Sequence, residues 1–242
     1  MSQAKKVFTR MCLNNWGGID HKVLEFHEYV NLFSGKSGSG KSTVMDAIQV
    51  ILYGSFSPSF LNKAADDAKN RRSVLSYLRG EQKDGSANRK DCDFCSVIAL
   101  EIEDTGTHII TCIGIAFEVR KSDSEIKKFV YFSHSGKMPE SEYLTEQGVC
   151  YSNQEIKKLV SARTKSDDNR GKGEVNRIYG SKEAYLGTLY DVILGYIDQN
   201  RFITMEKSAI ALKMTNGTGQ FIRDYMFPKN TSNTIATISE QL

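Results

Sequence analysis

The sequence predicts an α/β fold in which one glycine-rich loop joins a buried strand to a buried helix. The run 29–34 is almost continuously apolar, which is typical of a strand buried on both faces. The run 43–52 has apolar residues at 44, 45, 47, 48, 51 and 52, which cover much of a helix surface. Between them, residues 35–42 read Gly-Lys-Ser-Gly-Ser-Gly-Lys-Ser.

The elements on either side of this unit follow from alternation and turn residues. Strands are expected at 6–13 and 22–26, separated by a turn at 14–18. The runs 96–103 and 108–119 alternate around a turn, and 127–132 adds a third strand, so we expect an antiparallel meander. Helices are expected at 152–160, with Ser152 and Glu155 as a capping box, and at 186–194, with Ser181 as cap. Shorter helical pieces are expected at 207–213, 220–226 and from 234, and a charged loop at 161–173.

Composition bounds the class of protein. The chain has 242 residues, 40% hydrophobic and 25% charged, which fits one large globular domain and excludes wholesale disorder. The net charge of +3 does not require nucleic acid, so any such surface must be a local patch. Five cysteines, without a signal sequence or an 18-residue apolar run, predict a reduced cytoplasmic protein without a membrane partner.

Residues 35–42 match the pattern G-x-x-x-x-G-K-[ST], which binds nucleotide phosphates. Glycines let successive N–H groups point inward at a phosphate, and the following helix presents its positive end. Lys41 would neutralise the β- and γ-phosphates of ATP as the catalytic cation, and the Ser42 hydroxyl would bind Mg²⁺. The loop backbone would supply further contacts at Ser37, Gly38, Ser39, Gly40 and Thr43. The alternative is a Gly/Ser-rich turn that contains Lys-Ser by chance.

Hydrolysis needs a second carboxylate on Mg²⁺. The strand leading to Glu101 is interpreted as a hairpin edge, and no LSGGQ-like signature occurs in the sequence. The chain is therefore expected to carry half of an ATPase site.

The segment Phe33–Ile48, with Gly-x-Gly-Lys-Ser followed by Met45-Asp46-Ala47-Ile48, resembles the N-terminal head segment of SMC-like ATPases. Asn15-Trp16-Gly17-Gly18 is similar to the N-W-x-G segment of the JetC/MukB branch, and 62–66, 76–80 and 220–226 fit it too. The resemblance implies an ABC-type head, with a mixed sheet around the P-loop helix plus the meander. It implies an N-terminal lobe at 1–230 and the start of a coiled-coil arm at 231–242.

The same resemblance implies a function and partners. Two heads would sandwich ATP and Mg²⁺, each completed by a C-terminal lobe. The family moves DNA without sequence specificity, with kleisin and winged-helix subunits, and in Wadjet-type plasmid defence with a nuclease subunit. The alternatives are MukB- or condensin-like chromosome organisation, a DNA-repair ATPase, a self-contained P-loop NTPase or kinase, and a nucleotide-gated interaction module without turnover.

Family position also suggests roles outside the loop. Asn15 and Trp16, with Asn14, would flank the nucleotide, or else form a turn with a core tryptophan. Gln199 would contact Mg²⁺, with Gln220 as the other candidate, and Arg79 would lie near nucleotide or DNA or else be a solvated helix end. Basic side chains that could contact DNA phosphates, or simply be solvated, are Lys69, Arg71, Arg72, Arg89, Lys90, Arg163, Arg170 and Lys172. Neither the lone Cys92/Cys95 pair nor His21, His27, His108 and His134 have metal-site spacing.

Overall fold

A computed structural model of the chain describes residues 4–36, 38–58, 61, 73–82, 84–166 and 175–210. The chain divides into two units, Met1–Ile197 and Asp198–Leu242. The first unit is built on a six-stranded sheet in the order β2-β1-β3-β4-β5-β6. Its strands are β1 (Lys6–Trp16), β2 (Ile19–Glu25), β3 (Phe94–Asp104), β4 (Ile110–Val119), β5 (Lys128–Ser135) and β6 (Arg177–Tyr179). The meander is confirmed, whereas β6 was not predicted because three residues are too few for an alternating pattern.

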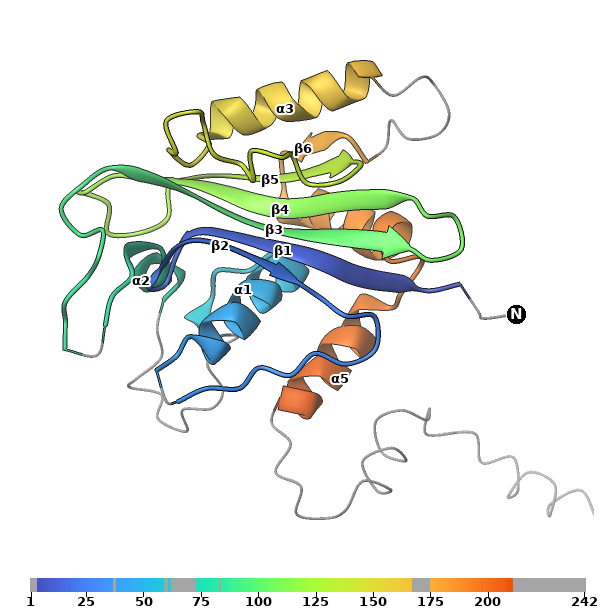
Figure 1. Ribbon diagram of the computed structural model, residues 1–242, viewed down its shortest axis with the longest axis horizontal. Coiled ribbons are helices and arrows are strands. Elements are labelled where there is room, and N and C mark those ends of the chain that lie inside the picture. Colours follow the sequence, from blue (N-terminus) through green and yellow to red (C-terminus); the bar gives the residue numbers. More distant parts are fainter. Residues whose placement is uncertain are drawn as a thin grey trace, which may run out of the picture. The chain divides into compact units, whose positions relative to one another are not determined.

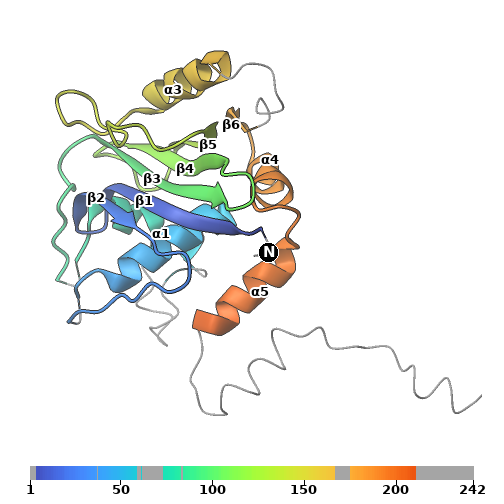
Figure 2. The same cartoon turned by 45° about the vertical axis from the view of Figure 1, so that its right-hand side comes forward.

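Helices cover both faces of this sheet. Figures 1 and 2 show α1 (Lys41–Tyr53) and α2 (Val74–Arg79) on one face, and α3 (Asn153–Ser166) on the other. The chain then forms α4 (Lys182–Gly187) and a π-helical turn, η3 (Thr188–Ile193). Helix α5 (Gln199–Ile210) belongs to the second unit. Among the described residues, no helix is long and apolar enough to cross a bilayer.

The capping signals in the sequence predict where two of these helices begin, although α3 continues to Ser166, into the charged loop expected at 161–173. The Glu155 carboxylate accepts from Ser152 N at 2.6 Å, and Glu155 N donates to Ser152 Oγ, so the capping box of α3 is confirmed. Ser181 Oγ caps α4 by accepting from Ala184 N at 3.2 Å.

The start of α5 was missed in the sequence. This helix begins at Gln199, well before the expected 207, because the Asp198 carboxylate accepts from Arg201 N at 2.7 Å and acts as its cap. The expected helices at 220–226 and 234–242, and the lobe boundary at 230, lie outside the described residues.

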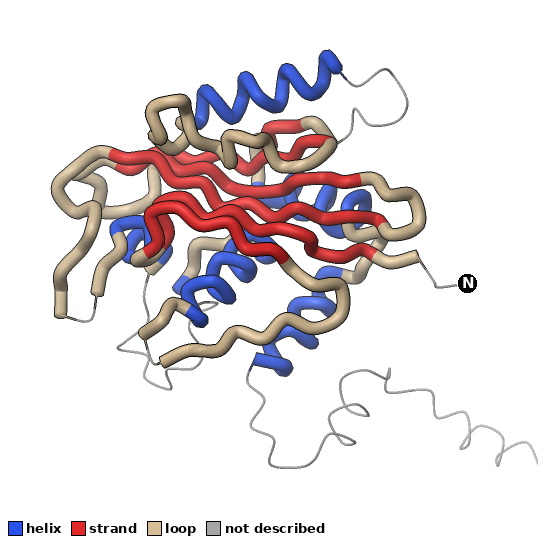
Figure 3. The backbone as a smooth tube through the Cα atoms, viewed as in Figure 1, coloured by secondary structure: helices blue, strands red, loops and turns tan. Residues whose placement is uncertain are grey.

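The strand expected at 29–34 is wrong. This segment has no strand conformation, and Figure 3 shows the connection from β2 to α1 as a loop. Tyr29, Val30 and Leu32 are 70%, 76% and 89% exposed. An apolar run predicts burial, but it becomes a strand only where neighbouring strands form hydrogen bonds with it.

All five strand pairings among the described residues are antiparallel, so the parallel part of the expected mixed sheet is not seen there.

The face that carries α1 is held by tyrosines as well as by apolar packing. Tyr185 Oη donates to Ile51 O at 2.9 Å, Tyr190 Oη to Leu52 O at 3.0 Å, and Tyr131 Oη to Gly54 O at 2.7 Å. These acceptors lie at the C-terminal end of α1, where helix carbonyls lack partners within the helix. The three hydroxyl groups therefore complete the hydrogen bonding of a buried helix end.

The opposite face carries a second core beneath α3. Ile156 and Val160 of α3 pack there with residues of β1, β3, β4 and β5 and with Met138 and Tyr143 from the loop after β5. His134 is fully buried in this region. Its Nδ1 lies 3.0 Å from Ser135 O, which can only accept, so Nδ1 carries the proton and Nε2 accepts from Tyr143 Oη at 2.9 Å. The neutral imidazole thus satisfies both neighbours.

This environment predicts an acid-sensitive fold. Burial lowers the pKa of His134 to about 4, from an ordinary value of 6.5. At pH values between these two pKa values, the His134 imidazole is protonated in the unfolded chain but neutral in the folded chain. The free energy of unfolding therefore decreases as the pH drops through this range, by up to about 3 kcal/mol from this group. Urea unfolding at a series of pH values should therefore show a smaller acid-side slope for His134→Gln than for the wild type.

The matched control is His108→Gln, because the His108 side chain is 78% exposed and pairs with Glu103 at the surface. We expect His108→Gln to keep the wild-type slope. Equal slopes for wild type and His134→Gln would contradict the assignment.

Candidate nucleotide-binding site

The glycine-rich loop runs directly into the first turn of α1. Gly40 is the N-cap of α1 and has φ 89°, a left-handed conformation that costs a side chain-bearing residue about 1–2 kcal/mol. Lys41 Nζ donates to Gly35 O at 2.7 Å, to Lys36 O at 2.9 Å and to Ser39 Oγ at 3.2 Å. The ammonium group therefore ties the beginning of the loop to its end. Ser37 lies outside the described residues.

The exposed side of this first turn carries the groups that phosphate chemistry needs. Ser42 is exposed and Lys41 is partly exposed, whereas Thr43 and Asp46 are buried. The backbone N–H groups of the first helical turn have no partner within the helix and carry its positive dipole. An ammonium, a free hydroxyl and these N–H groups together can hold a phosphate and a Mg²⁺ ion.

Trp16 fixes α1 from the side of the sheet. Its indole is fully buried, donates Nε1–H to Thr43 O at 2.9 Å, and stacks on Tyr77 with ring centroids 5.0 Å apart. The Tyr77 hydroxyl donates in turn to the buried Asp46 carboxylate of α1. Trp16 therefore contacts the P-loop helix as a core residue, and a direct contact with nucleotide stays a prediction. One signal for this arrangement was Asp46, the one acidic residue of α1, which stands between apolar neighbours in the sequence.

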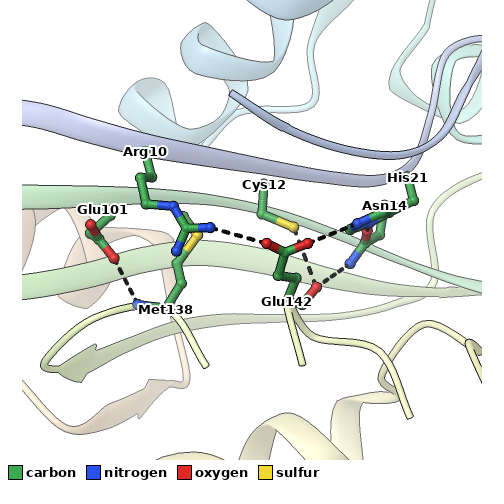
Figure 4. Close-up of polar contacts among 7 residues, drawn as sticks. All are labelled: Arg10, Cys12, Asn14, His21, Glu101, Met138 and Glu142. Atoms are coloured by element: carbon green, nitrogen blue, oxygen red, sulfur yellow. Dashed lines mark hydrogen bonds and ion pairs between the residues drawn. The ribbon is translucent and has the colours of Figure 1, made fainter. Parts of the chain in front are cut away.

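The neighbouring asparagines hold other elements. Asn15 has φ 55°, and its Nδ2 donates to Cys95 O at 2.7 Å. Asn14 is buried and donates Nδ2–H to Glu142 O at 2.8 Å, while its Oδ1 lies 2.6 Å from His21 Nδ1. Figure 4 shows this contact on the side of β1 away from α1. A nucleotide-flanking role for Asn15 therefore stays a prediction, and the Asn14 side chain faces away from the P-loop helix.

Asn14 is one of several residues that hold the turn at Glu142 against the sheet. Glu142 and the next residue, Tyr143, have φ of 52° and 60°, which is unfavourable for residues with side chains. The Glu142 carboxylate pairs with Arg10 at 3.0 Å and with His21 at 2.9 Å, and its carbonyl accepts from both Asn14 and Cys12 (Figure 4). These contacts hold a strained turn against the sheet.

Two arginines considered as phosphate or nucleotide contacts are bound within the fold. Arg89 is buried and donates to Leu78 O, to Gly17 O and to the Asp20 carboxylate, so the interpretation of this residue as a DNA contact is wrong. Arg79 donates to Lys121 O and Asp123 O. Both side chains thus link the region of α2 to nearby loops, because a guanidinium can donate to several carbonyls at once.

Glu101, the carboxylate at the end of an apolar run, is also explained. The sequence suggested that its strand is a hairpin edge. This interpretation is wrong, because the strand, β3, lies between β1 and β4. The buried carboxylate accepts from Thr9 Oγ1 at 2.8 Å and from Met138 N at 2.7 Å (Figure 4). Since Met138 belongs to the core on the α3 side, Glu101 is directed away from the P-loop helix.

The remaining expected site residues are not brought together by the described part of the chain. Gln199 is the first residue of α5 in the second unit, and its role as a Mg²⁺ ligand stays a prediction. Gln220 and the basic residues Lys69, Arg71, Arg72, Arg170 and Lys172 lie outside the described residues. No cluster of three or more His, Cys, Asp or Glu side chains that could hold a metal occurs among the residues described.

Comparison with known proteins agrees with this geometry. Residues 8–68 match the family described as the P-loop containing region of AAA domain. A stretch of 74 residues is 34% identical to the C subunit of the nuclease SbcCD from Staphylococcus haemolyticus (strain JCSC1435). That stretch is 29% of this chain and only 6% of the relative. The chain therefore contains a P-loop domain, and its fold class is α/β, of the kind found in lobes of ABC-type P-loop NTPases.

Two solved structures show weaker likeness. One comes from a study titled for ATP-driven dimerization and DNA-stimulated activation of SMC ATPases; it is 16% identical, covers 65% of this chain and 80% of that one, and has a TM-score of 0.34. The other is the recombination mediator protein RecF with ATP, at 15% identity, 89% and 47% coverage, and a TM-score of 0.35. Both TM-scores are below 0.5, so the fold class rests on the chain's own geometry and on the P-loop match.

The close approach at the β1–β2 turn gives a matched test. Gly17 has φ +60°, and a Cβ there would lie 2.5 Å from Thr43 Cγ2, whereas a Cβ on Gly18 would meet nothing within 4 Å. Gly17→Ala should cost about 2–4 kcal/mol of stability, from backbone strain plus overlap with α1. Gly18→Ala should change stability by less than about 0.5 kcal/mol. Urea unfolding of both variants measures the difference, and equal stabilities would contradict the packing described here.

Proposed function

We propose that the chain binds Mg-ATP at residues 35–43 as the N-terminal lobe of an SMC-like ATPase head. One observation carries this proposal: Lys41 and Ser42 lie on the solvent-exposed side of the first turn of α1. Lys41 also connects the two ends of the glycine-rich loop, because its ammonium group donates to the carbonyls of Gly35 and Lys36. In the bound state, Lys41 contacts the β- and γ-phosphates, and Ser42 binds Mg²⁺. The N–H groups between Ser37 and Thr43 surround the phosphates.

Phosphate binding requires a change in the contacts of Lys41. An ammonium group has three N–H donors, and Lys41 uses three contacts within the loop. The contact with Ser39 Oγ, at 3.2 Å, is the longest of them and the first to be exchanged for a phosphate oxygen. The two backbone contacts then keep the ammonium in place while it receives the ligand.

The segment that precedes the loop supports the proposal that the nucleotide site is completed by a second lobe. Tyr29, Val30 and Leu32 are exposed although the run around them has the pattern of a buried strand. In the proposal, this run pairs with strands of a C-terminal lobe, which also supplies the second Mg²⁺ carboxylate and the signature motif. The lobe extends over 1–230, and the coiled-coil arm begins at 231–242.

The cellular role follows from the SMC resemblance. We propose that two such heads engage around ATP and move cytoplasmic DNA with kleisin and winged-helix subunits, as in the JetC branch that acts in Wadjet-type plasmid defence. A second role is favoured by the partial likeness to a component of the nuclease SbcCD. In that second role, the protein is a DNA-repair ATPase that works with a nuclease. A nuclease partner is therefore expected both in plasmid defence and in repair.

The nucleotide site is tested by removing its cation. Lys41→Ala should weaken Mg-ATP binding by about 10- to 100-fold, because a charge-assisted hydrogen bond contributes about 1.5–3 kcal/mol. Isothermal titration with Mg-ATP measures the affinity. Lys22→Ala, an exposed lysine on β2, is the matched control and should bind as the wild type does. Unchanged binding by Lys41→Ala would refute the site.

The half-site is tested by turnover. The 242-residue chain should bind ATP yet hydrolyse it at well below about 1 s⁻¹, a slow rate for a complete enzyme. Turnover at or above that rate, lost in Lys41→Ala, would mean that the chain holds a complete site and would refute the dependence on a second lobe.

A further inference from the structure

The buried side of the first two turns of α1 carries one charged group, the Asp46 carboxylate. Thr43 and Asp46 are three positions apart and therefore lie on one face of the helix, and both are buried. Ser42 and Met45, each one position earlier, are exposed. The exposed face of α1 that carries the phosphate-binding hydroxyl is thus backed, inside the protein, by a carboxylate.

Helix packing does not require a carboxylate at this position. Taking a carboxylate out of water is costly, and an apolar side chain of similar volume fills such a position at lower cost. The contacts of Tyr185 and Tyr190 with α1 are different, because they satisfy backbone carbonyls that lack partners at the helix end. Asp46 lies in the interior of the helix, so its contact with Tyr77 has another origin.

The Tyr77 side chain is held firmly where it meets Asp46. Tyr77 is almost fully buried, and its ring stacks on Trp16 with the two ring planes 7° apart. The Tyr77 carbonyl accepts from Gly17 N at 2.8 Å, which binds α2 to the β1–β2 turn. The hydroxyl group therefore donates to Asp46 from a position that the sheet and α2 determine together.

We infer that Tyr77 is a positioning residue for the nucleotide site and acts through Asp46. Apolar contacts are non-directional, whereas a hydrogen bond to a carboxylate is directional and strong. Asp46 lies about 7.5 Å from Lys41 along the helix axis, so a bond that fixes Asp46 also fixes the turn that carries Lys41 and Ser42. Without the hydroxyl group, this turn samples more orientations, and ligand binding must then restrict them.

The inference rests on the proposed function for the identity of the ligand, but not for the effect of Tyr77 on α1. Trp16 is the one tryptophan of the chain, and its indole donates to Thr43 O in the first turn of α1. The fluorescence of this indole therefore reports the state of the turn in the absence of nucleotide.

Isothermal titration with Mg-ATP measures the effect on binding. Tyr77→Phe keeps the ring that stacks on Trp16 and removes only the hydroxyl group. It should weaken binding about 3- to 10-fold, which is part of what a hydrogen bond to a charged group contributes. The matched control is Tyr185→Phe, which removes a buried hydroxyl group that donates to the other end of α1. Both variants should unfold at lower urea concentration, but Tyr185→Phe should bind Mg-ATP as the wild type does.

Acrylamide quenching of Trp16 fluorescence gives a measurement without ligand. The indole is fully buried, so quenching requires local opening of the structure around it. Tyr77→Phe should raise the quenching constant about twofold or more, because the first turn of α1 opens more often. Tyr185→Phe should leave the quenching constant unchanged.

Substitutions of Asp46 separate positioning from a general loss of stability. Asp46→Ala should weaken Mg-ATP binding as much as Tyr77→Phe does. The double variant should lose no more affinity than either single variant, because both substitutions remove the same hydrogen bond. Asp46→Asn keeps an acceptor oxygen for the Tyr77 hydroxyl group and should recover part of the affinity lost in Asp46→Ala.

Three results would overturn the inference and leave the nucleotide site in place: wild-type affinity in Tyr77→Phe, equal losses in Tyr77→Phe and Tyr185→Phe, or additive losses in the double variant. If Tyr77→Phe does not fold, the comparison of Asp46→Asn with Asp46→Ala decides, and equal affinities would overturn the inference. Absence of Mg-ATP binding by the wild type would refute the proposed function, and the quenching of Trp16 would still decide whether Tyr77 fixes α1.

Discussion

The P-loop helix is held at both ends by hydrogen bonds from aromatic side chains to its backbone or to its one buried carboxylate. At the start, Trp16 donates to Thr43 O and Tyr77 donates to Asp46. At the end, Tyr185 and Tyr190 donate to the last carbonyls of α1. A helix fixed in this way cannot slide along its axis, so Gly40 and Lys41 stay where the loop must turn. Preorganised groups of this kind bind a ligand without first losing conformational entropy.

The β1–β2 turn connects this constraint to the rest of the sheet. Gly17 N donates to Tyr77 O, and Gly17 O accepts from Arg89, so the turn is bound to α2 and to the loop after it. On the other face, Glu142 binds Arg10 and Asn14 from the same strand. Strand β1 therefore contributes to both sides of the sheet, since Trp16 contacts the nucleotide helix and Arg10 and Asn14 contact Glu142 on the side of α3. The sheet is the rigid layer that separates these two surfaces, and a change in β1 acts on both.

Sequence patterns predicted the parts of the fold that are local. The runs 96–103 and 108–119 became β3 and β4 because their alternation matches the two faces of a sheet, and Ser152 with Glu155 marked the start of α3. The tyrosine contacts with α1 and the contact of Arg89 with Gly17 could not be predicted, because they join residues more than 70 positions apart. The glycine-rich loop was recognisable because its chemistry lies within eight consecutive residues, whereas Trp16 was open to two interpretations until its indole was seen against Thr43.

The run 29–34 shows where local reasoning fails, and its exposure has a consequence for the nucleotide site. Its apolar pattern predicts burial, yet its side chains are exposed and no described strand pairs with it. Exposed apolar side chains directly before a phosphate-binding loop link two events in the proposed function. Pairing of this run with strands of a second lobe would order the chain that enters the loop at Gly35, whose carbonyl already accepts from Lys41. Assembly of the head and tightening of the nucleotide site would then be one cooperative step, because the same few residues take part in both.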